Sequence, residues 1–150
     1  MEIFFKEDTA ESDTHSAEET EEVGKAVGAL AVKEKYSFIA LYGDLGAGKT
    51  AFTRGIAAVI APDAHVCSPT YTIVNEYGEG KQSLFHFDMY RINDEDSLDS
   101  IGFYDYFRRG GILVTEWSEK IPFALPERYL RVELLKIGEN DRRILITKVN

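Results

Sequence analysis

The fold of this chain is decided by Gly43-Asp44-Leu45-Gly46-Ala47-Gly48-Lys49-Thr50, which carries the pattern Gly-x-x-x-x-Gly-Lys-Thr. The apolar run Phe38–Leu41 comes just before it and has the composition of a buried parallel strand. The stretch Lys49–Ile60 follows and is expected to form a helix. The inward-facing side chains of that helix are expected to be Phe52, Ile56 and Val59. A strand, a glycine-rich loop and a helix in this order are typical of a loop that cradles phosphate groups.

The chemistry of this loop predicts a binding site for ATP and Mg²⁺. Its glycines let the backbone N–H groups point at phosphate oxygens, and the start of the following helix adds partial positive charge there. Lys49 is expected to reach the β- and γ-phosphates, and the Thr50 hydroxyl is expected to bind the metal ion. The predicted nucleotide-binding residues of the loop are Asp44, Leu45, Gly46, Ala47, Gly48, Lys49 and Thr50.

Such a loop needs a second contact to magnesium, which is usually an acid at the end of an apolar strand. Leu84–Asp88 and Ile112–Glu116 are both apolar runs that end in an acid. The residue pattern alone does not rank Asp88 against Glu116, so both remain candidates.

The other segments predict an α/β fold in one domain, residues 1–150. The expected elements are an edge strand at Glu2–Lys6, a helix from its N-cap Ser16 to about Val32, strands at Tyr71–Tyr77 and Ser83–Asp88, short helices at Glu95–Ser100 and Tyr104–Arg109, and strands at Tyr129–Lys136 and Arg142–Val149. Together they suggest a P-loop NTPase-like, three-layer domain. Its sheet is expected to be mixed and mostly parallel, with added antiparallel strands.

Composition and charge restrict the function. No apolar run approaches the roughly 20 residues that cross a bilayer, so no membrane contact is expected. Cys67 is the only cysteine, and a reducing cytoplasm is therefore expected. The net charge is -9; residues 1–22 hold nine of the 26 acids and one of the 17 bases, which leaves 17 acids and 16 bases elsewhere. Because nucleic-acid binders usually carry a basic patch, we expect a partner to hold any RNA.

Several common P-loop classes do not fit the sequence. A GTPase should carry an Asn-Lys-x-Asp guanine reader, which is missing here. A small-molecule kinase should carry a basic lid, whereas the paired arginines Arg108-Arg109 and Arg142-Arg143 lie in no obvious lid. Motor ATPases and transporters are much longer chains.

Four segments in fixed order make the sequence recognisable: Gly43–Thr50, Ser68-Pro69-Thr70-Tyr71-Thr72-Ile73-Val74, His86-Phe87-Asp88-Met89-Tyr90-Arg91 and Glu116-Trp117. Together they resemble the bacterial TsaE family, formerly called YjeE, of tRNA threonylcarbamoyladenosine (t6A) biosynthesis. The similarity covers essentially the whole chain. The phosphate loop is generic, but the other three segments in combination are highly specific.

The resemblance implies an ATPase that works with TsaD and TsaB in modifying adenosine 37 of tRNA. The tRNA would be bound only indirectly, through that complex. Thr50 and Glu116 match the family's magnesium ligands, and Asp88 matches an acid important for hydrolysis. Ser68–Thr72 resembles switch I, and His86–Arg91 resembles switch II. The positions of Thr20 and Arg142 would approach the adenine and ribose.

Residue chemistry adds further expectations. The hydroxyls of the Ser-Pro-Thr turn, including Thr70, can meet the γ-phosphate or its water, or can simply cap the turn. Arg91 can stabilise transition-state charge or form a salt bridge with Asp88 or Glu95. His86 is interpreted as a hydrogen-bonded structural histidine. The predicted catalytic residues are Lys49, Asp88 and Arg91.

Two other functions stay open. A small-molecule kinase of P-loop type would use Asp88 as a base toward a bound hydroxyl. A nucleotide-gated binding module would hardly turn over ATP.

Overall fold

The computed structural model describes residues 2–44, 46–67 and 73–150. The predictions for Leu45, for Thr70 and for the switch I segment 68–72 therefore lie outside the described residues. The strands are β1 (Thr9–Thr14), β2 (Phe38–Tyr42), β3 (Val74–Glu79), β4 (Gln82–Asp88), β5 (Ile112–Glu116), β6 (Tyr129–Lys136) and β7 (Arg142–Val149). The helices are α1 (Ala17–Glu34), α2 (Lys49–Ile60), α3 (Glu95–Ser100) and α4 (Phe103–Tyr106), with 3₁₀ turns η1 (Phe107–Arg109), η2 (Ser118–Lys120) and η3 (Pro122–Ala124).

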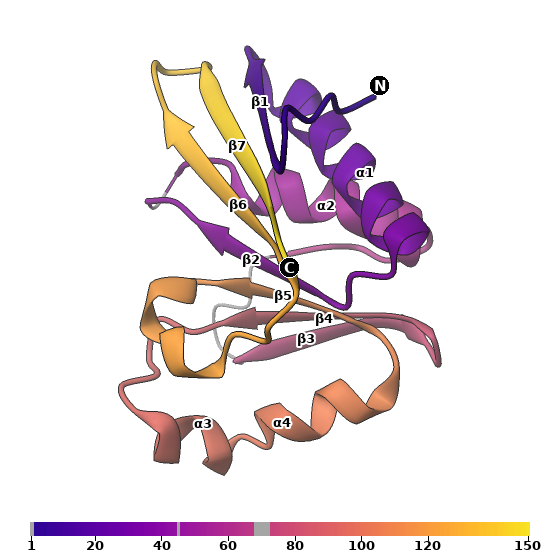
Figure 1. Cartoon of the computed structure of the whole chain (residues 1–150), viewed down its shortest axis with the longest axis vertical. Coiled ribbons are helices and arrows are strands. Elements are labelled where there is room, and N and C mark those ends of the chain that lie inside the picture. The colour runs from indigo at the N-terminus through magenta and orange to yellow at the C-terminus, as the bar shows by residue number, and fades with distance from the viewer. Residues whose placement is uncertain (1, 45, 68–72) are drawn as a thin grey trace.

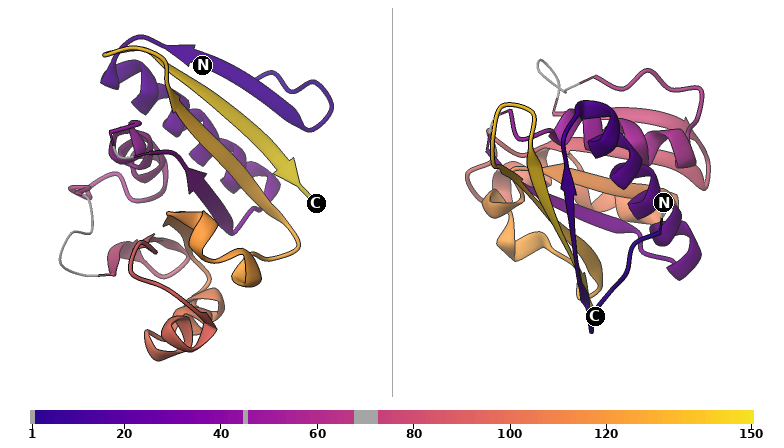
Figure 2. Two further views of the ribbon diagram at one scale, coloured as in Figure 1. Left: turned by 90° about the vertical axis from the view of Figure 1, so that its left-hand side faces the viewer. Right: turned by 90° about the horizontal axis from the view of Figure 1, so that it is seen from above.

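The described strands form one mixed sheet in the order β1-β7-β6-β2-β5-β4-β3 (Figure 1). Strands β6, β2, β5 and β4 are parallel neighbours at its centre. Antiparallel pairs flank them, with β1, β7 and β6 on one side and the hairpin β3–β4 on the other (Figure 2). Three of the six described pairings are thus parallel, so the sheet is mixed as expected but half parallel rather than mostly so.

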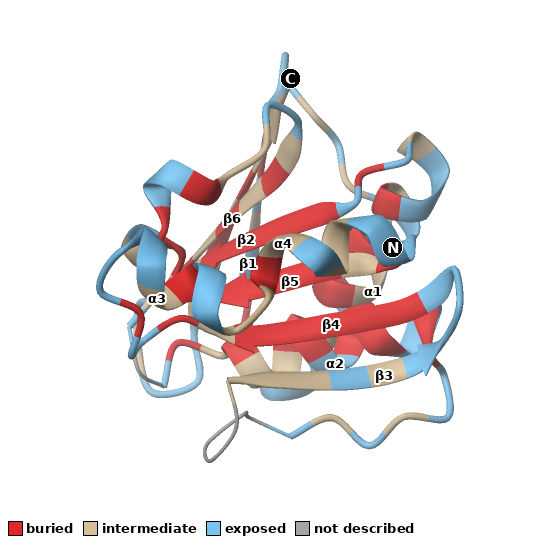
Figure 3. Ribbon diagram, turned by 90° about the horizontal axis from the view of Figure 1, so that it is seen from below, coloured by how far each residue is buried: buried red, intermediate tan, exposed pale blue. Residues whose placement is uncertain are grey.

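Helices cover both faces of the sheet, which confirms the three-layer arrangement. Alternation along β2 sends Ile39 and Leu41 into a core with α1 and α2, and Phe38 and Ala40 into a second core with α3 and α4. The central strands β2, β4 and β5 are accordingly buried along most of their length, whereas β3 is an exposed edge (Figure 3). Buried parallel strands end together at one edge, where ligands of open α/β sheets bind.

Helices α1 and α2 touch backbone to backbone. A Cβ atom at Gly24 would lie 2.1 Å from the carbonyl oxygen of Phe52, and one at Gly55 would lie 2.0 Å from that of Glu21. Only glycine fits at both crossing points. This close crossing holds the N-terminus of α2, and with it the phosphate loop, against the sheet.

Some sequence predictions of element bounds were wrong. The N-terminal edge strand is β1 at Thr9–Thr14, not Glu2–Lys6, and it pairs with β7. Helix α1 continues past Val32 to Glu34, and its C-cap Lys35 adopts φ 60°. Val59 is 39% exposed rather than buried, whereas Phe52 and Ile56 are buried as expected. The bounds of α2, α3, β6 and β7 match the prediction.

Among the described residues, no helix is both long and apolar enough to cross a membrane.

Candidate active site

The phosphate loop connects the end of β2 to the start of α2. Gly48 is the N-cap of α2 and has φ 101°, a conformation that other residues rarely adopt. Gly43 packs so closely on β6 that a Cβ atom there would lie 2.8 Å from the carbonyl oxygen of Leu134. Within the loop, the N–H of Ala47 donates to the carbonyl oxygen of Asp44 at 3.0 Å. The loop thus curls around the N-terminus of α2, where an anion is favoured.

Lys49 lies at the centre of the site and is only 6% exposed. Its ammonium donates to the carbonyl oxygen of Gly43 at 2.8 Å and lies 4.0 Å from Glu116 Oε1. The same ammonium lies 4.4 Å from the ring centroid of Trp117. The Lys49 ammonium is therefore surrounded by a backbone carbonyl, a carboxylate and an aromatic face beside the phosphate loop.

The two candidate acids are neighbours. Asp88 and Glu116 stand opposite each other at the ends of the adjacent parallel strands β4 and β5. A carboxylate oxygen of Asp88 accepts a hydrogen bond from the N–H of Tyr90 at 3.0 Å. Both acids line a pocket of about 270 Å³, together with Gly46, Gly48, Lys49, Thr50 and Trp117. The structure thus brings the predicted loop and both predicted acids together.

The donor set of this pocket fits Mg²⁺. The Thr50 hydroxyl and the carboxylates of Asp88 and Glu116 are hard oxygen ligands. No group of three or more His, Cys, Asp or Glu side chains among the described residues is arranged to hold a metal by itself. Mg²⁺ usually takes one or two protein ligands and completes its shell with phosphate oxygens and water, so a small protein donor set is appropriate.

His86 contacts the site through Glu116, one of the residues that line the pocket. It is fully buried in β4, and its Nε2 forms a short hydrogen bond with Glu116 Oε2. The sequence interpretation of a hydrogen-bonded histidine was right, but it missed that the partner is a candidate metal ligand. His86 alternates with Phe85 and Phe87 along β4 and faces the opposite side of the sheet from them, and its bond to Glu116 depends on the β4–β5 register.

Trp117 and Tyr90 form an aromatic border beside the pocket. Their ring centroids are 5.1 Å apart, and Tyr90 is 58% exposed. Trp117 has φ 58°, which turns the chain sharply after Glu116. Trp117 itself lines the pocket at the phosphate loop.

Arg142 and Thr20 flank the loop on the side of β7 and α1. The guanidinium of Arg142 donates to the carbonyl oxygens of Gly46 and Ala47. The buried hydroxyl of Thr20 pairs with that of Thr14 at 2.8 Å, and its methyl would lie 3.5 Å from a Cβ atom at Gly48. Both residues therefore lie beside the loop; their contact with adenine or ribose stays a prediction.

Arg91 and His15 are exposed, and neither is among the described residues that line the pocket at the phosphate loop. Arg91 forms no ion pair with any residue that the structure describes, so the salt bridges considered for it with Asp88 and Glu95 are not formed in the described part. His15 Nδ1 hydrogen-bonds Asp141 at 2.8 Å, and this bond raises the pKa of His15 above its usual 6.5.

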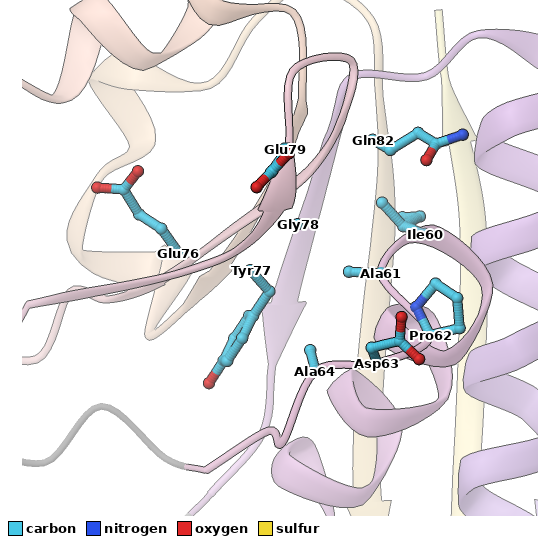
Figure 4. Close-up of a pocket in the computed structure, with 10 residues that line it drawn as sticks. All are labelled: Ile60, Ala61, Pro62, Asp63, Ala64, Glu76, Tyr77, Gly78, Glu79 and Gln82. Atoms are coloured by element: carbon cyan, nitrogen blue, oxygen red, sulfur yellow. The ribbon is translucent and has the colours of Figure 1, made fainter.

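A larger pocket of about 490 Å³ lies elsewhere (Figure 4). It opens between the C-terminal end of α2 and the β3–β4 hairpin, at the opposite end of α2 from the phosphate loop. Its charged lining residues are Asp63, Glu76 and Glu79, with no lysine or arginine among the described lining. An anionic nucleotide would be repelled there, so the smaller pocket at the loop is the candidate active site.

Comparison with known proteins agrees with this geometry. Residues 14–144 match the family described as threonylcarbamoyl adenosine biosynthesis protein TsaE. The chain belongs to the TsaE family. A TsaE protein of Bacillus subtilis is 38% identical over 91% of this chain and 84% of that protein. A TsaE protein of Haemophilus influenzae is 42% identical over 78% of this chain and 74% of that protein.

A solved structure shows the same fold. The crystal structure of Bacillus subtilis YdiB superposes with a TM-score of 0.74 and 31% identity, over 95% of this chain and 86% of that one. The resemblance to TsaE that the sequence motifs predicted is thereby confirmed. The individual roles of Lys49, Asp88, Arg91 and Glu116 stay predictions within this family fold.

Proposed function

We propose that this TsaE-family chain is the ATP-binding and ATP-hydrolysing subunit of the t6A modification system at adenosine 37 of tRNA. The observation that carries the proposal is the convergence of Lys49, Thr50, Asp88 and Glu116 on one pocket at the phosphate loop. These residues come from α2 and from the ends of two adjacent parallel strands. All 150 residues would serve as one ATPase domain.

In this proposal Thr50 and Glu116 hold Mg²⁺ in the ATP complex. When bound, the ion neutralises charge on the β- and γ-phosphate oxygens. Lys49 leaves the carbonyl of Gly43 for the terminal phosphates, because a phosphate oxygen is a stronger acceptor for its ammonium. Asp88 orients the attacking water and can accept its proton. Trp117 covers one side of the pocket and limits access of bulk water to the reacting atoms.

Positioning supplies most of phosphoryl-transfer catalysis. A positively charged side chain therefore stabilises the transition state little until it is held beside the phosphate. Arg91 is exposed and lies three residues after Asp88. We infer that TsaD and TsaB hold this arginine beside the γ-phosphate. Turnover by the isolated chain would then be slow.

The charge of the chain supports an indirect role for tRNA. The net charge is -9, and counterion release from RNA phosphates requires clustered lysine and arginine. We therefore propose that TsaD and TsaB hold the tRNA. The cytoplasm is the proposed compartment, in line with the single exposed thiol of Cys67.

Phosphate release tests this function. It would be measured for the chain alone, with TsaD and TsaB, and with both proteins and tRNA. The proposal expects a low basal rate that rises with the partners, and Arg91→Ala should reduce the stimulated rate more than the basal rate. A fast basal rate that ignores the partners would refute the subunit role. Transfer of phosphate to a small acceptor would instead establish the kinase alternative.

A further inference from the structure

The imidazole of His86 is buried behind the candidate active site and points one nitrogen at it. The residue is 0% exposed, and its β4 neighbours Phe85 and Phe87 face the opposite core. Nε2 is bonded to Glu116 Oε2. The other ring nitrogen, Nδ1, has no hydrogen-bond partner among the described residues. Glu116 is therefore the only hydrogen-bond partner of the ring among the described residues.

Glu116 depends on this bond in return. Its other oxygen, Oε1, faces the Lys49 ammonium at 4.0 Å, which is beyond hydrogen-bond distance. Among the described residues, His86 is thus the only hydrogen-bond donor to the Glu116 side chain. The terminal torsion of a glutamate is broad and poorly restrained by itself. Without His86, the carboxylate would be free to rotate in the pocket.

We propose that His86 is a positioning residue: its Nε2–H holds one oxygen of Glu116, so that the other oxygen is presented to the metal ion. This inference rests on the proposed role of Glu116 as a magnesium ligand. Groups that hydrogen-bond a metal ligand from behind orient it, and their loss typically costs about 10–100-fold in metal affinity.

Burial of a polar ring favours this role over simple packing. Placing a polar nitrogen in the core without a partner costs free energy, as Nδ1 does here. A leucine or phenylalanine at this position would fill the core without that cost. A carboxylate only accepts hydrogen bonds, so Nε2 must carry the proton toward ionised Glu116. Nδ1 is then left without a partner among the described residues.

Two variants of matched length separate positioning from packing. His86→Gln keeps an N–H donor at about the reach of Nε2, whereas His86→Met has the same chain length and no donor. Calorimetry would measure the affinity for ADP with and without Mg²⁺. We expect His86→Met to lose about 10–100-fold of the Mg²⁺-dependent gain in affinity. His86→Gln should retain most of that gain, and the metal-free affinity should be the same in both variants.

Two calorimetric results would overturn the inference. One is a wild-type Mg²⁺-dependent gain in affinity in His86→Met, and the other is an equal loss of that gain in His86→Met and His86→Gln. Glu116→Ala separates the failure of this inference from the failure of the proposed metal site. If Glu116→Ala keeps the full Mg²⁺-dependent gain in affinity, Glu116 is not the metal ligand; if it loses the gain, only the role of His86 is refuted. Should His86→Met fail to fold, ¹⁵N spectra of the wild-type imidazole decide instead: a proton on Nε2 that shifts in Glu116→Gln supports the inference, and a proton on Nδ1 alone overturns it.

Discussion

Arg142 Nε donates a hydrogen bond to the carbonyl oxygen of Ala47 at 3.1 Å, and so ties the last strand to the phosphate loop. Its Nη2 donates to the carbonyl oxygen of Gly46 at 3.0 Å. Its Nη1 donates to the carbonyl oxygens of Gly138, Glu139 and Asp141 in the β6–β7 turn. The guanidinium thus clamps loop and turn together, so its geometry favours holding the loop in shape for the nucleotide.

Replacing Arg142 should loosen the phosphate loop. A lysine cannot reach carbonyls in several directions at once, because it lacks the planar fork of donors. We expect Arg142→Lys to weaken ATP binding about tenfold, or about 1.4 kcal/mol, with the fold intact. Titration calorimetry with a non-hydrolysable ATP analogue would measure this. Arg143→Lys is the matched control on the same strand, because Arg143 pairs with Glu11 and Asp13 at the surface. Equal effects in both variants would argue against the clamp.

Much of this arrangement could be predicted from local sequence. The Gly-x-x-x-x-Gly-Lys-Thr pattern placed the phosphate loop between β2 and α2, and the bounds of α2 are those expected. Strands β6 and β7 were found because both alternate and a turn-forming segment separates them. These elements are specified by residues close together in the chain.

The elements and contacts that the sequence did not predict depend on residues far apart in the chain. Strand β1 has the polar sequence Thr-Ala-Glu-Ser-Asp-Thr, and only its pairing with β7 makes it a strand. The more apolar Ile3 and Phe5 instead pack against the core that includes α1, without forming a named strand. The bond between His86 and Glu116 joins residues 30 positions apart, and no local pattern encodes it.

The buried Lys49 gives a second prediction. Lys49→Ala should weaken ATP binding and lower hydrolysis by about 100-fold or more, because no other described cation lines the pocket. The fold should persist, since the side chain bonds only one carbonyl. Phosphate release and calorimetry would test both parts, with surface Lys25→Ala as the control. Wild-type affinity together with wild-type turnover in Lys49→Ala would contradict the nucleotide site.

The crossing of α1 and α2 predicts a stability difference between two glycines. Gly55→Ala forces a methyl group to within 2.0 Å of a backbone oxygen and should cost about 1–3 kcal/mol of unfolding free energy. At Gly28 the nearest atoms are 3.2–3.4 Å away, and alanine also favours the helix, so Gly28→Ala should be nearly neutral. Urea unfolding of both variants would show the difference. Equal stabilities would mean that the helices cross less closely.

The exposed pair His15–Asp141 predicts a pH effect. Its hydrogen bond raises the pKa of His15 in the folded protein above 6.5. The stabilisation by this pair is therefore complete below pH 6.5 and is lost as the pH rises through the folded pKa. In an NMR titration, Asp141→Asn should lower the pKa of His15. An unchanged pKa in Asp141→Asn would show that the pair does not form in solution.

We propose that Glu116 binds the metal ion and that Asp88 orients the attacking water, although both acids lie in one pocket. Calorimetry of ATP-analogue binding with and without Mg²⁺, applied to Glu116→Ala and Asp88→Ala, tests it most directly. We expect Glu116→Ala to lose most of the Mg²⁺-dependent gain in affinity, and Asp88→Ala to keep the gain but lose turnover. A larger metal-linked loss in Asp88→Ala would contradict it.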